Sequence, residues 1–541
     1  MTETPGSPYD FDFAVIGSGF GGSVAALRLS EKGYRVGVLE MGKRYRTEDF
    51  PRTNWNLRKF LWMPRLFLYG IQQLTLLRDV FILHGAGVGG GSLVYANTLL
   101  VPADEVFQEP SWARLNDWKA ALAPHYATAR RMLGVATCPS VGEADRLLDE
   151  VVGEMGRPGT FHHTEVGVYF GEPGVAAPDP YFGGQGPPRT GCTFCGGCMV
   201  GCRVGAKNTL DKNYLYLAER LGARIIPETR VTDIRPLPDG GYELTACRST
   251  RAWRGPSRTY RARAVVCAAG VLGTVGLLMG CQARGTLPRL SAQLGNYVRT
   301  NSEAILGAAT HAPGRDFSKG IAIMSGVYPD PRTHVEVVRY PAGSDFMALL
   351  ATVLTGGGRP WPRQLRWLGN IARHPWRFLR TLDPRGWAKR TAILLVMQPL
   401  DNHMRLRLRR RWWWPFRPAL DSDIGTARPV PTFMPLANDI AARLARKVEG
   451  QPLSGLLEVL FDVSTTAHIL GGCPIGRDPA EGVIDTRFQV FGHEGLYVVD
   501  GSVMPGNLGV NPSLTITALA EYAMSQVPAK PGAQAEAECV S

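Results

Sequence analysis

Long apolar runs are absent from this chain of 541 residues. A membrane-spanning helix needs about 20 consecutive apolar residues, so we expect none here. Residues 1–10 are polar, so a cleavable signal peptide is not expected either. Internal repeats and long low-complexity tracts are also missing, and only the Pro- and Ala-rich end at 528–541 is expected to be disordered. These absences favour a cytoplasmic globular protein whose contact with a membrane, if it has one, is peripheral.

Acidic residues are scarce relative to basic ones, 47 against 60, which gives a net charge of +13. Much of the excess lies at 359–417, a segment with many Arg, most of the chain's Trp and only Asp383 and Asp401 as acids. No nucleic-acid-binding motif accompanies these residues, so nucleic acid is not an expected partner. The segment is either a basic face of a domain or a surface that docks on a bilayer, where Trp rings and cations meet anionic lipid.

A glycine-rich turn follows an apolar strand near the N-terminus. Residues 11–16 are predicted to form a buried parallel strand, and the turn after them is Gly17-Ser-Gly19-Phe-Gly21-Gly22. Such glycines allow a tight turn, a close approach of the backbone to a pyrophosphate, and close packing of helix on strand. A second strand at 35–39 ends in Glu40, an acid placed to bind a ribose hydroxyl. The pattern predicts a dinucleotide site, and at this level NAD and FAD both fit it.

Two further segments belong with this turn. Gly87-Val-Gly89-Gly90-Gly91-Ser92 is so rich in glycine that its backbone must approach a ligand or another segment closely. Near the C-terminus, an apolar strand ends in Asp500-Gly501 and is followed by Val510-Asn511-Pro512. A chain that closes a dinucleotide site with its last residues wraps most of its length around one cofactor, which makes redox chemistry the leading interpretation.

Together with Ala268-Ala-Gly-Val-Leu-Gly-Thr274, these segments resemble the glucose-methanol-choline (GMC) oxidoreductases, and among them most of all the FAD-containing cholesterol oxidases. The resemblance implies an α/β flavoprotein with a discontinuous Rossmann-like FAD domain (8–110, 190–300 and 460–527) and a substrate domain of antiparallel sheet and helices (111–189 and 301–459). It implies hydride transfer from an alcohol to FAD, with a bulky apolar, sterol-like substrate and O2 or a one-electron acceptor as partners. The implied FAD-binding residues are Gly17, Gly19, Phe20, Gly21, Gly22, Glu40, Gly87, Gly89, Gly90, Ser92, Asn97, Val231 (main chain), Asp500, Gly501 and Asn511.

The same resemblance identifies candidate catalytic residues. His468, in Ala467-His-Ile-Leu-Gly-Gly-Cys473, matches the active-site His of the family, and Asn511 matches its second polar residue. Removal of a hydride requires that the hydroxyl be oriented and its proton accepted, which His and an amide can do. Glu336 resembles the glutamate with which cholesterol oxidases move the steroid double bond, although Val335-Glu-Val-Val is also compatible with a strand that points Glu336 outward.

A cysteine run departs from the cholesterol oxidases. Cys192, Cys195, Cys198 and Cys202 have the C-x2-C-x2-C-x3-C spacing of bacterial ferredoxins, but Arg203 replaces the Pro that follows there. An Fe–S cluster, a structural zinc ion and free thiols all remain open. A cluster would favour an alternative function, a GMC dehydrogenase for another lipid-like or natural-product alcohol. A flavin-bearing electron-transfer subunit is a further alternative, which the His468–Asn511 pair disfavours.

The segment 51–83 mixes aromatic residues, Leu and Arg, and Pro64 and Gly70 interrupt it. These interruptions exclude one long helix. The segment is therefore interpreted either as packing of the core or as a lid over an apolar pocket.

Overall fold

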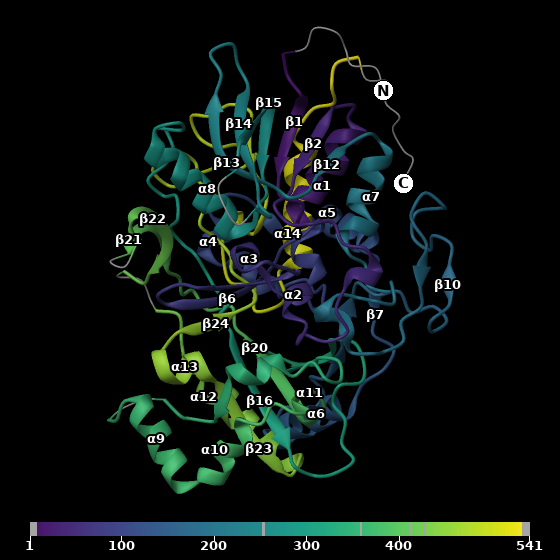
Figure 1. Ribbon diagram of the computed structural model, residues 1–541, viewed down its shortest axis with the longest axis vertical. Coiled ribbons are helices and arrows are strands. Elements are labelled where there is room, and N and C mark those ends of the chain that lie inside the picture. Colours follow the sequence, from purple (N-terminus) through teal and green to yellow (C-terminus); the bar gives the residue numbers. More distant parts are fainter. Residues whose placement is uncertain (1–7, 252–254, 358–359, 412–413, 426–428, 533–541) are drawn as a thin grey trace.

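The computed structural model describes residues 8–251, 255–357, 360–411, 414–425 and 429–532. Figure 1 shows two regions, each built on one large sheet. Among the described residues, no helix has the length and apolar character needed to cross a membrane. Residues 533–541 of the expected disordered tail lie outside the described part, whereas Lys530 donates a hydrogen bond of 2.7 Å to Asp12.

The first region is built on a sheet in the order β12-β2-β1-β15-β14-β13, with β25 paired to β15. Strands β12, β2, β1, β15 and β25 are parallel, and β13 and β14 join antiparallel at the edge. The parallel strands are apolar because helices cover both of their faces. Their bounds are β1 (Phe11–Ile16), β2 (Val36–Leu39), β12 (Arg224–Ile226), β13 (Thr229–Pro236), β14 (Tyr242–Arg248), β15 (Ser257–Cys267) and β25 (Leu496–Val498).

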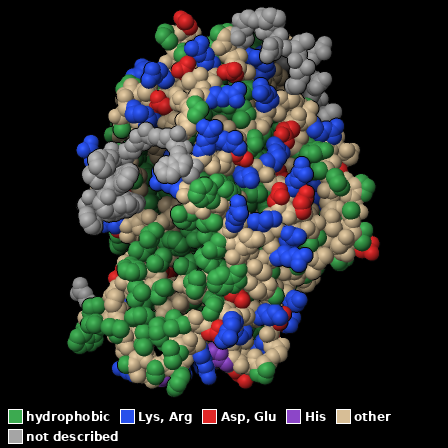
Figure 2. Space-filling model, in the orientation of Figure 1, with side chains coloured by type: hydrophobic (Ala, Val, Ile, Leu, Met, Phe, Trp, Pro, Cys, Tyr) green, Lys and Arg blue, Asp and Glu red, His purple; other side chains and the backbone are tan. Residues whose placement is uncertain are grey.

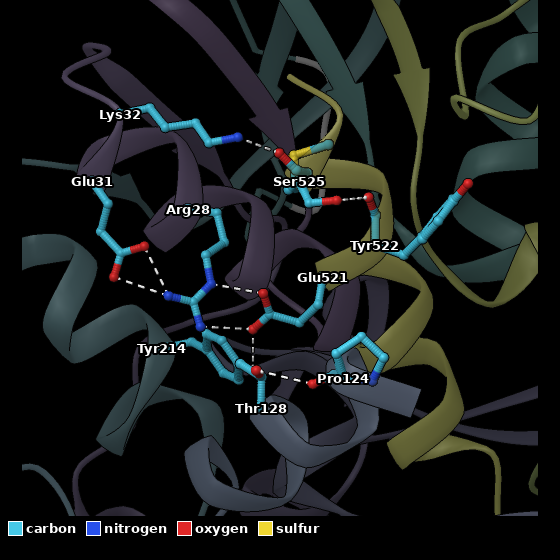
Figure 3. Close-up of polar contacts among 10 residues, drawn as sticks. Arg28, Glu31, Lys32, Pro124, Thr128, Tyr214, Glu521, Tyr522 and Ser525 are labelled. Carbon is cyan, nitrogen blue, oxygen red and sulfur yellow. Dashed lines mark hydrogen bonds and ion pairs between the residues drawn. The ribbon is translucent and has the colours of Figure 1, made fainter. Parts of the chain in front are cut away.

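Helices from both ends of the chain lie against each other in this region (Figure 1). Helix α1 (Phe20–Glu31) packs against α14 (Ser513–Ser525) and α7 (Tyr214–Arg220). As Figure 3 shows, Arg28 binds both carboxylate oxygens of Glu521, at 2.7 and 2.9 Å, and Tyr214 donates to the same carboxylate at 2.6 Å. A buried ion pair of this kind is costly to break on one side, so it fixes the C-terminal helix against the N-terminal one.

The second region is built on an antiparallel sheet in the order β19-β23-β16-β20-β18-β17-β8. Helices α6 (Glu143–Glu154) and α12 (Pro435–Lys447) cover one of its faces. Because side chains alternate along a strand, the residues between those on the helix-covered face point to the other side of the sheet. The strand bounds are β8 (His162–His163), β16 (Ala304–Thr310), β17 (Ile323–Asp330), β18 (Thr333–Val338), β19 (Ala351–Val353), β20 (Thr391–Met397) and β23 (Gly450–Gly455).

The other face of this sheet forms an apolar cluster with the segment 51–83. That segment folds as short pieces, α2 (Leu57–Phe60), β3 (Trp62–Met63), β4 (Leu68–Tyr69), β5 (Gln72–Leu76) and β6 (Val80–Gly85). Phe60 and Leu61 are buried in the cluster, whereas Leu66 and Phe67 are exposed. The segment therefore contributes to a core and also presents apolar side chains to solvent.

Helix α5 (Trp118–Met132) lies within the stretch that the sequence assigns to the substrate domain. It packs against α14, and Trp112, Trp118 and Tyr126 belong to the hydrophobic core of the first region. The helix packs with the first region because that position buries its large aromatic side chains.

Candidate active site

The N-terminal turn has the close packing that its glycines predict. Gly17 has a φ of +99°, and a Cβ there would lie 2.3 Å from the Ala268 carbonyl oxygen. A Cβ on Gly21 would lie 1.7 Å from the Val499 carbonyl oxygen, so the strand-to-helix turn is pressed against the C-terminal segment. A Cβ on Gly19, by contrast, would meet no atom within 4 Å. The turn is thus closed on its protein side and open where a pyrophosphate would approach the start of α1.

The second glycine-rich segment lies against this turn. Gly87, Gly89 and Gly90 all have positive φ, and a Cβ on Gly90 would lie 2.6 Å from Gly19 Cα. The Gly89 N–H donates to Ser18 Oγ at 3.1 Å. Two glycine-rich backbone segments therefore meet at the open side of the first turn, as a cradle for a dinucleotide requires.

Ser92 and Asn97, which follow in the chain, are both buried. Ser92 Oγ donates to the Gly89 carbonyl at 2.6 Å and accepts from the Leu210 N–H at 3.1 Å, so it fixes the shape of the loop. The buried Oδ1 atom of Asn97 has no hydrogen-bond partner. A buried amide oxygen without a partner is rare in folded proteins and fits the side of a site that a polar ligand completes.

Glu40 is engaged within the protein. Its Oε2 atom accepts from Ser18 Oγ at 2.6 Å and its Oε1 atom accepts from the Gly42 N–H at 2.6 Å. Burial raises the pKa of the carboxyl, and these hydrogen bonds lower it. The Ser18 N–H also donates to Oε2 at 3.0 Å, so of the about four lone pairs of the carboxylate at most one, on Oε1, stays available for a ribose hydroxyl. The Thr229 N–H donates to the Glu40 carbonyl at 2.8 Å, which places the strand of Val231 at this end of the cradle.

Asp500 and Gly501 close the cradle from the C-terminal side and are both buried. Asp500 accepts from the Ser502 N–H at 2.8 Å and from Thr274 Oγ1 at 2.5 Å. Phe20 and Gly22 are likewise buried in α1. These open turns and buried oxygens fit a bound FAD, which Gly17–Gly22, Glu40, Gly87–Asn97 and Asp500–Gly501 would hold.

His468 is oriented by a carboxylate that the sequence analysis missed. Its Nδ1 atom forms a hydrogen bond with Glu303 Oε1, and Glu303 Oε2 accepts from the Ala467 N–H at 2.8 Å. The His468 N–H donates to Thr466 Oγ1 at 2.9 Å. A carboxylate at Nδ1 favours the proton on that nitrogen and leaves Nε2 as the acceptor.

Asn511 and Glu336 form the second polar pair. Asn511 Nδ2 donates to Glu336 Oε2 at 3.2 Å, while Asn511 Oδ1 and Glu336 Oε1 are buried without a partner. Glu336 is fully buried, so it does not point outward from its strand. Burial raises the pKa of Glu336 to about 8, against the Asn511 hydrogen bond, and the nearby charge of Glu303 raises it further.

One short segment, Thr300–Glu303, connects the two pairs. Asn301 and Ser302 have positive φ, which turns the chain just before β16. Asn301 Nδ2 donates to the Val510 carbonyl at 2.9 Å, next to Asn511, and Glu303 binds His468. No motif marks this segment, and the only signal is that Asn tolerates left-handed backbone well.

The polar pairs lie beside an apolar surface. Glu336 is paired with Leu395 of β20 in the sheet register, and Leu395 is paired on its other side with Ile305 of β16. Leu395 lies on the face of the sheet away from α6 and α12. That face forms a cluster with Phe60, Leu61, Val200, Ile323, Val338, Tyr340, Ala348, Trp387, Ala388, Ile393 and Met397. Glu336 is thus a buried acid on the face of the sheet that carries this apolar cluster, which we call the apolar wall.

The cysteine run does not come together as a metal site. Cys192 and Cys198 are buried, Cys195 is exposed, and all four are free thiols. Among the described residues, no group of three or more His, Cys, Asp or Glu side chains is arranged to hold a metal ion. The residues as they lie here do not fit an Fe–S cluster, and we derive no electron-transfer step through them.

Lys207, just after this run, anchors it to the glycine-rich segment instead. Its ammonium donates to the carbonyls of Leu93, Tyr95 and Cys198 at 3.0, 2.8 and 2.8 Å.

Two family models match the sequence. "GMC oxidoreductase" matches residues 437–520, which include His468 and Asn511, and "NAD(P)-binding Rossmann-like domain" matches residues 15–67.

Similar proteins extend over nearly the whole chain. A cholesterol oxidase of Acinetobacter baumannii is 47% identical over 531 residues, covering 96% of this chain and 95% of that protein. A cholesterol oxidase of Mycobacterium tuberculosis is 50% identical over 537 residues, covering 96% of this chain and 92% of that protein. Among solved structures, pyridoxine 4-oxidase from Mesorbium loti aligns with a TM-score of 0.61 at 16% identity, covering 95% of this chain and 98% of that one, which shows the shared fold.

Proposed function

This chain belongs to the GMC oxidoreductase family, and from that premise we propose that it oxidises the secondary hydroxyl of a sterol-like alcohol to a ketone with FAD. The observation that carries the proposal is the pair of polar contacts, Glu303–His468 and Glu336–Asn511, between the dinucleotide cradle and an apolar wall. The relatives named cholesterol oxidase support a sterol as the substrate class.

The residues divide the work of the oxidation. The reaction removes a hydride from the carbinol carbon and a proton from the hydroxyl, and FAD, when bound, accepts the hydride. His468 Nε2 accepts the hydroxyl proton, because Glu303 keeps the other ring nitrogen protonated. Asn511, whose Oδ1 atom is unpartnered, orients the hydroxyl. The apolar wall excludes water and holds the ring system.

Glu336 is suited to a second step. We propose that it removes a proton from a ring carbon of the ketone product and returns it to another carbon, which moves a double bond into conjugation with the new carbonyl. This transfer is internally balanced and needs no further reactant. Since burial raises its pKa to about 8, the carboxylate is a stronger base than an exposed one.

Single-turnover reduction of the flavin by cholesterol tests the proposal. His468→Ala should slow reduction by at least about 10²-fold, the contribution of an acid–base group, while the flavin stays bound. Glu336→Gln is the matched control, because it should reduce its flavin normally and release an unconjugated ketone. Absence of flavin reduction by any sterol, with rapid reduction by a linear long-chain alcohol, would contradict the sterol assignment.

We further propose that O2 is the electron acceptor, in keeping with the oxidase names of the relatives. Hydrogen peroxide should then form in a 1:1 ratio with ketone. A water-insoluble substrate also resides in lipid, so we propose that the enzyme contacts a membrane peripherally.

A further inference from the structure

Two helices carry an apolar face that no residue of the described ranges covers. They are α9 (Arg363–Arg373) and α10 (Pro375–Thr381), next to α13 (Leu456–Phe461). Figure 2 shows hydrophobic side chains gathered over this part of the molecule. We name this surface the helical apolar face; its exposed residues are Trp361, Leu365, Leu368, Trp376, Leu379, Leu382 and Phe461, with exposed fractions of 50–75%.

The spacing of these residues places them on one side of each helix. Leu365 and Leu368 are three residues apart in α9, as are Trp376 and Leu379 in α10, so each pair shares a face. Trp367 points the other way, and its Nε1 atom donates to Thr352 Oγ1 at 2.9 Å on β19. The inner side of α9 is therefore fixed to the sheet, and the outer side is free to meet a partner. Apolar side chains that lie exposed next to one another mark interaction sites, whereas scattered ones do not.

The charges along α9 and α10 are of one sign, whereas exposed Asp462, beside Phe461 at the end of α13, borders the face as an acid. Residues 360–382 contain no Asp or Glu, and Arg373, Arg377 and Arg380 are exposed. Cationic side chains beside Trp and Leu are the composition of helices that lie in the interface of an anionic bilayer. This combination favours a lipid leaflet as the partner. An acidic protein groove would pair with the Arg side chains but would not bury the apolar rings. Of the Trp residues at 359–417, Trp412 and Trp413 lie outside the described residues.

Short connections link the helical apolar face to the apolar wall. The next helix along the chain, α11 (Trp387–Arg390), buries Trp387 in the apolar cluster beside β18 and β20. The turn Phe346–Leu350 leads into β19, which α9 and α10 contact. Phe346 packs on the same cluster, whereas Leu349 is exposed.

We propose that the helical apolar face is a docking surface for an anionic lipid leaflet. Docking through this face would hold the apolar wall near the lipid layer that contains the sterol. This inference rests on the proposed function, because it assumes a substrate that partitions into lipid.

Co-sedimentation with vesicles of phosphatidylcholine, with and without phosphatidylglycerol, tests the docking. The holoenzyme should bind the anionic vesicles, and salt should release it, because exposed charges are screened beyond about 8–10 Å near physiological ionic strength. The double variant Trp376→Ser/Leu379→Ser should bind at least about 10-fold more weakly, since two apolar side chains no longer leave water. Leu221→Ser changes the exposed apolar residue just after α7; it is the matched control and should bind as the wild type does.

Activity assays distinguish a failure of the docking surface from a failure of the proposed function. The double variant should oxidise cholesterol supplied in cyclodextrin at the wild-type rate and lose at least about 10-fold with cholesterol in vesicles. Equal vesicle binding by wild type and double variant would overturn the docking surface. So would a wild-type dimer that the double variant makes monomeric while vesicles retain neither, because the face would then join two copies. If wild type binds vesicles but oxidises no sterol in either form, the docking surface stands and the proposed function fails.

Discussion

Glu303→Gln tests the arrangement of the site most directly, because it removes a charge and keeps the volume. The carboxylate serves two partners, Ala467 N–H at 2.8 Å and His468 Nδ1. An amide has one acceptor, and if that acceptor keeps the Ala467 N–H, the NH2 group faces Nδ1. His468 must then carry its proton on Nε2, where it no longer accepts the proton of the substrate. We expect flavin reduction to slow by about 10²–10⁴-fold, the range for a lost general base.

The measurement is anaerobic single-turnover reduction of the flavin by cholesterol, with steady-state kcat and KM beside it. A loss in kcat with little change in KM indicates a positioning role, whereas a purely structural role would lower flavin content and thermal stability instead. Glu303→Asp keeps the charge and should recover part of the rate. Reduction of the Gln variant within about threefold of the wild-type rate would refute the reasoning, since a lost base costs far more.

Three other experiments probe separate parts of the structure. Folding raises the pKa of Glu336 from 4.5 to about 8, so the neutral carboxyl contributes fully to the free energy of unfolding below about pH 4.5. This contribution is lost as the pH rises to about 8. In denaturant titrations across that range, Glu336→Gln should make the free energy of unfolding depend less on pH. Gly21→Ala places a Cβ 1.7 Å from the Val499 oxygen and should cost on the order of 3 kcal/mol of unfolding free energy and most of the bound flavin, whereas Gly153→Ala, whose Cβ meets nothing within 4 Å, should cost neither. Because no described group of side chains is arranged to hold a metal ion, anaerobically purified protein should contain less than about 0.3 iron per chain; about four irons per chain, lost in Cys195→Ser, would establish a cluster instead.

The dinucleotide cradle could be predicted from the sequence because its signals are local. Strands predicted at 11–16 and 35–39 occur as β1 (Phe11–Ile16) and β2 (Val36–Leu39). Glycines mark the turns because only they fit the close contacts seen at Gly17 and Gly21. Patterns of this kind can be recognised in a single sequence, because they do not depend on residues that lie far away along the chain.

The partner of His468 could not be predicted, because Glu303 lies far away in the sequence and in no motif. Only the pairing of β16 with β20, and the left-handed turn at Asn301 and Ser302, place it there. Local pattern also left open whether Glu336 points outward, which the register with Leu395 decides. The cofactor-binding and catalytic assignments stay predictions until the variants above are measured.

Segments that are far apart in the sequence pack together at the Gly17–Gly22 turn, and this packing affects how the protein folds during synthesis. Strand β1 and helix α1 leave the ribosome long before Val499, β25 and α14, which pack against them. At about 5–20 residues per second, synthesis of the intervening chain takes on the order of 25–100 s. During that time the apolar side of α1 that α14 later covers stays open to solvent or to a chaperone. Capture of the flavin is therefore expected to follow synthesis of α14, and a chain truncated before α14 should accumulate as an aggregation-prone apoprotein.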